Sequence, residues 1–296
     1  MFKMAERHHY ISRFYLNYFS PAKHPGKVWV YTGKRPALQS IKRYVANIEN
    51  FYTISTEKGD SNIIEKELSK LETHTGRIIK KLHGNDFNLT KDELETMVTF
   101  ISYLRARTPA LRDSVNSSIT MERTAMLRMI ASDEALFKKE MGENNEITFK
   151  EFKDHVFQNL ESMDMNMNSH EATNVMTFAA EEIKKMLSEM KWNFFVAPNN
   201  FNYVTSDNPV FPFMNNWKMP YQPGFAFKDV EVYFPVTPKI SMLGTYMDVS
   251  VSKVVTGDTV NVINSRIINN RYEYMYSNMN EEEFSAQCDL TINKLF

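Results

Sequence analysis

The stretch 89–113, LTKDELETMVTFISYLRARTPALRD, holds the start, the buried face and the end of one predicted helix. Thr90 followed by Glu93 has the form of a capping box, in which each side chain accepts the other residue's backbone N–H. Pro109 ends or kinks a helix, because it lacks an amide hydrogen and its ring clashes with the preceding turn. We therefore expect a helix near residues 91–107, in the middle of a helix-rich region.

The apolar face of this helix leads into a positive charge. Its stripe consists of Leu94, Val98 and Ile101, with Met97 and Leu104 beside them. Arg105 continues the same line, and an inward-pointing guanidinium needs an anion because an unpaired buried charge is very costly. The preceding predicted helix offers Glu65 and Glu72, seven residues apart on the shoulder of its own apolar stripe. With Arg107, these residues predict either a purely structural Arg–Glu network or a network that orients a site open to solvent.

The regions on either side of this helix set the fold class. Residues 61–190 contain almost no proline or glycine, whereas KVWVYTGK (27–34) and DVEVYFPVTP (229–238) alternate as strands do. We expect helices near 61–83, 91–107, 109–141, 148–161, 169–190 and 258–270. The order predicts a single α+β domain over residues 1–296, in which a central helical block (58–190) is inserted between N-terminal (1–57) and C-terminal (191–296) portions of one small mixed or antiparallel sheet.

Composition narrows the functional classes. With 35 basic and 36 acidic residues, the formal net charge of −1 provides no overall attraction to nucleic acid or anionic membranes. Cys288 is the single cysteine, which excludes zinc sites built from several thiolates and suits a reducing compartment. No secretory signal is visible in residues 1–30, and no apolar run approaches the ~20 residues of a spanning helix. We expect a soluble, cytoplasmic protein with no membrane partner.

Polar residues at a predicted strand end form a second candidate element. In YVTSDNPVF (203–211), Asp207 and Asn208 precede Pro209, a pattern typical of a turn. Asp207 is therefore either part of a structural Asx turn or a strand-end carboxylate that acts as metal ligand or general base.

The N-terminal segment AERHHYISRFYLNYFS (5–20) provides the third element. Two histidines precede a run of aromatic and aliphatic residues, which predicts that the segment docks on the protein body. Docking would fix His9 against other groups, either as a hydrogen-bonded packing residue or as an acid, base or ligand. We expect His8 to be exposed. Phosphate-binding and hydrolase motifs of the GxxxxGK[ST], GxGxxG, HExxH and GxSxG types are absent from the chain.

These elements, taken in order, resemble the bacterial domain-of-unknown-function 4238 family. The matching residues are His9, Tyr10, Phe14, Tyr15, Leu16 and Phe19; Glu65 and Glu72; Arg107, Thr108 and Pro109; Thr205 through Pro209; and Phe234, Pro235 and Pro238. One departure is Ser12, where the family often has proline. The resemblance spans about residues 8–275 and supports one domain, but it supplies no reaction by analogy.

Two hypotheses of function follow from this polar set. The candidate site residues are His9, Glu65, Glu72, Arg105, Arg107, Asp207 and Asn208, of which Glu65, Glu72 and Asp207 would hold Mg²⁺ or Mn²⁺. Carboxylates, arginine and histidine together suit hydrolysis or transfer at a phosphate ester, with nucleic acid or a nucleotide as substrate, as in a nuclease or toxin of phage defence. The alternative is a non-catalytic module that binds a ligand or partner and uses the same residues as a structural network.

Overall fold

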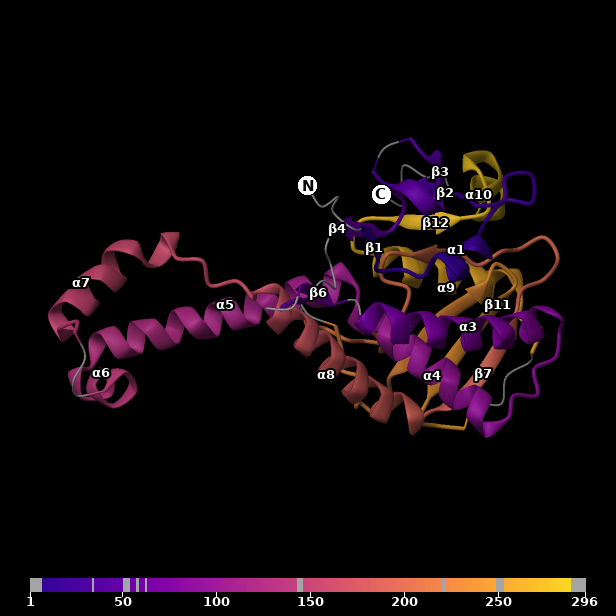
Figure 1. Ribbon diagram of the computed structural model, residues 1–296. Helices are drawn as coiled ribbons and strands as arrows, with labels where there is room; N and C mark the ends of the chain where they lie inside the picture. Colours follow the sequence, from indigo (N-terminus) through magenta and orange to yellow (C-terminus); the bar gives the residue numbers. More distant parts are fainter. Residues whose placement is uncertain are drawn as a thin grey trace.

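The protein has an α+β fold, seen here in a computed structural model (Figure 1). The structure describes residues 7–33, 35–49, 54–56, 59–61, 63–142, 146–219, 222–248 and 253–288. Two four-stranded antiparallel sheets and several layers of helices form the body, and one long helix projects away from it.

The first sheet joins the two ends of the sequence. Its strand order is β3-β2-β12-β8, and the bounds are β2 (Lys27–Tyr31), β3 (Ala37–Ser40), β8 (Thr205–Ser206) and β12 (Met275–Ser277). Each pair is antiparallel, with Met275 opposite Tyr31 on one side and opposite Ser206 on the other. The predicted insertion of a helical block between two parts of one sheet is therefore confirmed.

The second sheet is built from C-terminal strands alone, whereas the sequence predicted one sheet. Its order is β7-β11-β10-β9, with bounds β7 (Lys191–Val196), β9 (Phe211–Phe213), β10 (Glu231–Thr237) and β11 (Ile240–Thr245). Strands β10 and β11 are joined by a two-residue turn, so they pair with each other instead of extending the first sheet.

Helices cover both faces of the second sheet. Alternate side chains of β10 point to opposite faces, so they pack into two different cores. Val232, Phe234 and Val236 pack into one core with α1 (Arg13–Asn17), α3 (Ile63–His83), α4 (Lys91–Ala106) and α8 (Ser169–Ser188). Tyr233 packs into a second core with α9 (Gly257–Asn269) and α10 (Glu281–Cys288). This three-layer arrangement places the C-terminal end of α4 near strand β8.

Local sequence explains where the helices begin. Thr90 and Glu93 form the predicted capping box of α4, with Glu93 N–H 3.2 Å from Thr90 Oγ1. Thr108 caps the next helix, and Pro109 occupies its first turn, where its missing N–H costs nothing.

Three helices form an arm that extends from the body (Figure 1). The arm comprises α5 (Pro109–Ser132), α6 (Glu134–Met141), α7 (Phe149–Asn159) and the 3₁₀ turn η1 (Leu160–Ser162). The sequence predicted one helix over 109–141, but Asp133 breaks it. Asp133 is extended, at φ −134° and ψ 111°, and its side chain caps α6 by accepting the N–H groups of Ala135 and Leu136.

The N-terminal segment docks on the body, as predicted. Strand β1 (Arg7–His9) pairs with β4 (Asn47–Glu49), and α2 (Ile41–Tyr44) and the hairpin β5 (Ile54–Thr56)–β6 (Gly59–Ser61) complete this part. His8 is buried, not exposed, because side chains alternate along β1 and His9 takes the outer position. Among the described residues, no helix is long and apolar enough to cross a membrane.

Candidate functional site

Arg107 and Glu72 connect the end of α4 to α3. Both terminal nitrogens of Arg107 lie 3.1 Å from Oε1 of Glu72. Ser12 donates its hydroxyl to the same carboxylate oxygen and accepts a hydrogen bond from Nη2 of Arg107. The Arg107 side chain is only 3% exposed, whereas that of Glu72 is 26% exposed, so the carboxylate is the solvent-facing member of this pair.

His9 lies beside this ion pair in a half-buried position. Its Nε2 is 3.1 Å from the carbonyl oxygen of Ile41, and because a carbonyl can only accept, Nε2 carries the proton. Burial lowers the pKa of His9; Arg13 and Arg107 act in the same direction, and the Ile41 carbonyl and Glu72 oppose them. His9 is thus a neutral imidazole near physiological pH, with Nδ1 as its basic atom.

Arg105 points to the other side of α4 from Arg107. Its Nη1 donates to Asn208 Oδ1 at 2.7 Å, and its Nη2 to Gln222 Oε1 at 3.2 Å. No described carboxylate pairs with Arg105, whereas the sequence suggested a glutamate partner from the preceding helix. Two residues on a helix differ by ~200° in direction, so Arg107 faces α3 and Arg105 faces the 208 turn. Burial without a counterion lowers the pKa of Arg105 to about 10.

Asp207 is fully buried, and its side chain binds the backbone of a loop. Its carboxylate accepts the backbone N–H groups of Tyr272 at 2.8 Å, Glu273 at 2.6 Å and Tyr274 at 2.8 Å. Burial raises the pKa of Asp207, and these amide donors oppose the rise. Asn208 adds a bond from Nδ2 to the carbonyl of Asn270 at 2.7 Å. The two residues after β8 therefore fix the segment 270–274 that enters β12.

The predicted residues thus form two clusters at opposite sides of the end of α4. One contains His9, Glu72 and Arg107, and the other contains Arg105, Asp207 and Asn208. Glu65 belongs to α3, but its side chain lies outside the described residues. Within the part of the chain that the structure describes, no group of three or more His, Cys, Asp or Glu residues is placed to hold a metal ion. The Mg²⁺ or Mn²⁺ site stays a prediction.

A half-open pocket of about 530 Å³ lies at the base of the arm, on the outer side of the segment fixed by Asp207. We call it the arm-base pocket. It is lined by Tyr10, Asn47, Ile48, Pro109, Arg112, Asp113, Asn116, Asn166, Met167, Tyr272, Glu273 and Tyr274. Three tyrosines, three asparagines and one arginine give it flat aromatic faces, amide hydrogen-bonding groups and a cation. Its size is in the range of small-molecule sites.

The tyrosines are set by contacts on both sides of the pocket. Tyr272 donates its hydroxyl to Asp113 Oδ2 of α5 at 2.5 Å, which links the 270–274 segment to the arm. Tyr274 stacks nearly parallel on Tyr276, with ring centroids 6.4 Å apart. The Tyr276 hydroxyl in turn shares a hydrogen bond with Tyr10. Tyr10 and Tyr274 of the pocket are therefore connected through the buried Tyr276 behind them.

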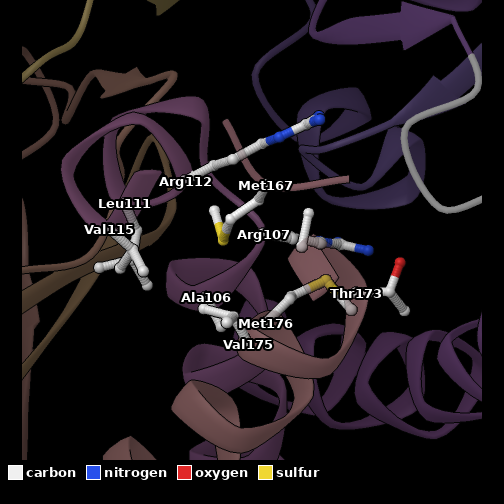
Figure 2. Close-up of a pocket in the computed structure, with 10 residues that line it drawn as sticks. Ala106, Arg107, Leu111, Arg112, Val115, Met167, Thr173, Val175 and Met176 are labelled. Carbon is white, nitrogen blue, oxygen red and sulfur yellow. The ribbon is translucent and has the colours of Figure 1, made fainter. Parts of the chain in front are cut away.

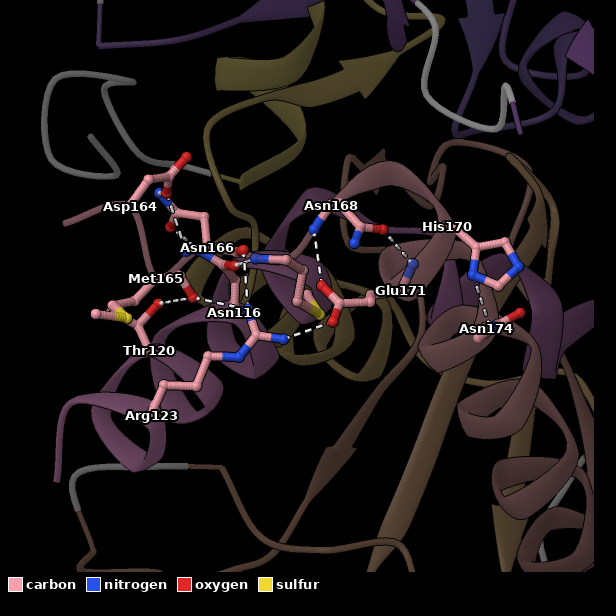
Figure 3. Close-up of polar contacts among 11 residues, drawn as sticks. Asn116, Thr120, Arg123, Asp164, Met165, Asn166, Asn168, His170, Glu171 and Asn174 are labelled. Atoms are coloured by element: carbon pink, nitrogen blue, oxygen red, sulfur yellow. Dashed lines mark hydrogen bonds and ion pairs between the residues drawn. The ribbon is translucent and has the colours of Figure 1, made fainter. Parts of the chain in front are cut away.

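The opposite wall is fixed by a polar network at the base of α5, drawn in Figure 3. Asn116 donates to Asn166 Oδ1 at 2.7 Å and accepts the backbone N–H of Met167 at 2.8 Å. Arg123 donates to the carbonyls of Met165 and Asn166, and forms an ion pair with Glu171 at 2.6 Å. The start of α5 and the segment 164–168 are thus held together.

A second, much smaller pocket lies where the end of α4, the start of α5 and the start of α8 meet (Figure 2). Its volume is about 20 Å³, enough for roughly one water molecule. It is mostly apolar and is lined by residues of α4, α5 and α8, including Arg107 and Arg112. It is too small for a ligand. Because it is lined by Arg107 and also by Arg112 and Met167 of the arm-base pocket, it shows that the Arg107 cluster and the arm-base pocket lie on neighbouring sides of one helix junction.

Sequence reasoning missed most of the arm-base pocket. Its residues come from the turn after β1, from β4, α5, the 164–168 segment and the approach to β12, and only Tyr10 and Pro109 belong to the motifs singled out in the sequence. RYEYMYS (271–277) holds a signal that could have been used, since its tyrosines alternate as do residues on one side of an extended segment.

Comparison with known proteins places the chain in a family. It has no significant match among curated proteins or among solved structures. A family model described as "Protein of unknown function (DUF4238)" matches residues 7–281 of the 296. Because the match covers nearly the whole chain and includes every element that carried the resemblance, the protein belongs to the DUF4238 family.

Proposed function

We propose that the arm-base pocket binds a nucleotide or a short stretch of nucleic acid. The observation that carries this proposal is that Asp207, itself fully buried, holds the backbone of three consecutive pocket residues, 272–274. Burying a carboxylate costs free energy, and here the hydrogen bonds of the buried carboxylate fix one wall of an open pocket. Support of this kind behind a binding surface is characteristic of preorganised sites.

The side chains of the pocket suit a base joined to a phosphate. Tyrosine rings offer stacking faces, which bind bases with little sequence preference. Asparagine amides can pair with the edge of a base, and Arg112 supplies the positive charge that a phosphate requires. Asp113 and Glu273 limit the negative charge that the pocket tolerates, which favours a ligand with few phosphates.

A titration of the purified protein with nucleoside monophosphates and short single-stranded oligonucleotides tests this proposal. Tyr272→Ala and Arg112→Gln should each lower affinity by about tenfold or more, the scale expected for one stacked base or one charged contact. Phe178→Ala removes a similarly exposed ring on α8, away from the pocket, and should leave affinity unchanged. Equal affinity for wild type and both pocket variants would contradict the proposal.

The hydrolase hypothesis is favoured by a separate observation. His9 is neutral with a basic Nδ1, and Glu72 beside it is the solvent-facing carboxylate, so this pair can move a proton to or from a bound ester. We propose it as a second function, a phosphoester hydrolase or nuclease with a cytoplasmic role in phage defence or as a toxin. Glu72→Gln and His9→Gln should then abolish turnover of a nucleotide or oligonucleotide, measured with Mg²⁺, Mn²⁺ or chelator, while binding persists. Toxicity on expression should disappear in the same variants.

A further inference from the structure

One face of the arm helix α5 is exposed along its outer half. Seven residues at heptad spacing make up this face, which we call the arm seam: Ser118, Met121, Glu122, Ala125, Arg128, Met129 and Ser132. Met121 is 72% exposed and Met129 63%. Two large apolar side chains this open on one helix face, with the small Ala125 between them, are candidates for an interaction surface.

The other side of α5 is already occupied. Leu127 and Ala131 pack with Val156 and Leu160 of α7 and η1, which forms the small core of the arm. The arm therefore has one face committed to its own fold. All seven residues of the arm seam are exposed, and none of them belongs to that core.

The arm seam reads the same in both directions. Around Ala125, the methionines lie four residues before and after, at 121 and 129, and the serines lie seven residues before and after, at 118 and 132. An antiparallel pair of α5 helices with its two-fold axis at Ala125 would place each methionine opposite the other methionine of the partner. A surface that matches itself in this way is what a two-fold interface requires.

The two charged residues of the arm seam also lie symmetrically about Ala125, and they have opposite charges. Glu122 and Arg128 lie three residues before and after Ala125, and neither forms an ion pair with a described residue. In the antiparallel arrangement each Glu122 meets an Arg128 at both ends of the contact. A parallel arrangement in register would instead place glutamate opposite glutamate and arginine opposite arginine, which is unfavourable.

We infer that the arm seam is a homodimer interface, in which α5 helices of two copies pack antiparallel about Ala125. The small side chain at the axis lets the two helix backbones approach closely. A contact over residues 118–132 is ~22 Å long at 1.5 Å per residue, so it would bury little surface, and we expect a dissociation constant in the micromolar range.

A charge exchange tests the inference in solution. Wild-type full-length protein should shift from monomer to dimer over about 1–100 µM in sedimentation equilibrium, the range of small interfaces. Arg128→Glu and Glu122→Arg should each weaken dimerisation by about tenfold, because each puts like charges opposite one another. The double variant restores opposite pairs and should recover wild-type association. A monomeric wild type, or a double variant no better than the single ones, would overturn the inference.

Cysteine cross-linking tests the position of the axis. In a Cys288→Ser background, Ala125→Cys lies on the axis and should form a disulfide dimer under mild oxidation. Ser118→Cys lies on the same face, but its two copies would be ~21 Å apart along the helices and should not cross-link to each other. A mixture of Ser118→Cys and Ser132→Cys proteins should cross-link. Self-cross-linking of Ser118→Cys would indicate a parallel pair and contradict the inference.

Discussion

Asp207 and Tyr274 are bound to each other in both directions: the Asp207 backbone N–H donates to the Tyr274 carbonyl at 3.0 Å, and the Tyr274 N–H donates to Asp207 Oδ2 at 2.8 Å. The first bond continues the pairing of β8 with β12, and the second closes the loop before it. A buried side chain thus extends a two-residue strand into a rigid wall of the arm-base pocket.

Asp207→Asn should destabilise the protein by about 1–3 kcal/mol, because the amide group keeps one acceptor but turns an NH₂ toward a backbone N–H. Chemical denaturation measures this change. Asp229→Asn, at an exposed aspartate, should leave stability within ~0.5 kcal/mol of wild type. A similarly small effect of Asp207→Asn would show that the three hydrogen bonds from backbone N–H groups to the carboxylate contribute little to stability.

Arg105→Met should loosen the 270–274 segment more than it lowers global stability. The substitution removes a buried cation that has no described carboxylate partner, so the desolvation cost disappears together with the hydrogen bonds to Asn208 and Gln222. Hydrogen exchange should become faster at residues 270–274, while the melting temperature stays within a few degrees. Unchanged exchange in that segment would contradict a positioning role for Arg105.

Glu72 and Arg107 should be strongly coupled. Glu72→Gln leaves the buried Arg107 guanidinium without a counterion and should cost about 2–4 kcal/mol, and Arg107→Met should cost less because the carboxylate that it leaves unpaired is partly exposed. A double-mutant cycle should give a coupling energy of at least ~1 kcal/mol. Additive effects of the two substitutions would mean that the ion pair contributes nothing.

His9 should make stability depend on pH in the acidic range. Its folded-state pKa is lowered by burial, so the folded protein holds the proton less tightly than the unfolded chain does. The contribution of His9 is fully present above its unfolded pKa of ~6.5 and is lost as the pH falls below it. Denaturation at pH 7.5 and 5.5 should show a smaller loss in His9→Gln than in wild type, and His155→Gln, at an exposed histidine, should behave like wild type.

Gly257→Ala should be destabilising by about 1–3 kcal/mol, the usual cost of overpacking. A Cβ at Gly257 would lie 2.2–2.6 Å from ring atoms of Phe201, at the start of α9. Gly33→Ala is a matched control, because a Cβ there meets nothing within 4 Å. Thermal melts of the two variants compare them directly, and equal melting temperatures would show that the Phe201 ring moves aside freely.

Local patterns predicted the helices well, since a helix depends on neighbours within a few residues. The capping box at Thr90, the stop near Pro109 and the order of elements were all readable. The break at Asp133 was not predicted: Ser132 and Asp133 are weak helix formers and Asp is a favoured N-cap, but strong helix formers lie on both sides of them, and the structure shows that the chain starts a new helix there.

The partners of the buried charges could not be predicted in the same way. Periodicity showed that Arg105 points inward, but its partners, Asn208 and Gln222, lie more than a hundred residues away in sequence. The structure also assigns Ser12 to the Arg107–Glu72 pair, which no spacing rule would have selected.

By itself, the sequence determined the α+β class, the insertion of the helical block and the inward direction of Arg105, because each depends on patterns along single segments. Only the tertiary structure decided which charges meet, that the C-terminal strands form a sheet of their own, and that Asp207 supports an open pocket at the base of the arm. Those features depend on contacts between segments far apart in the chain, and such contacts are set by how whole faces pack.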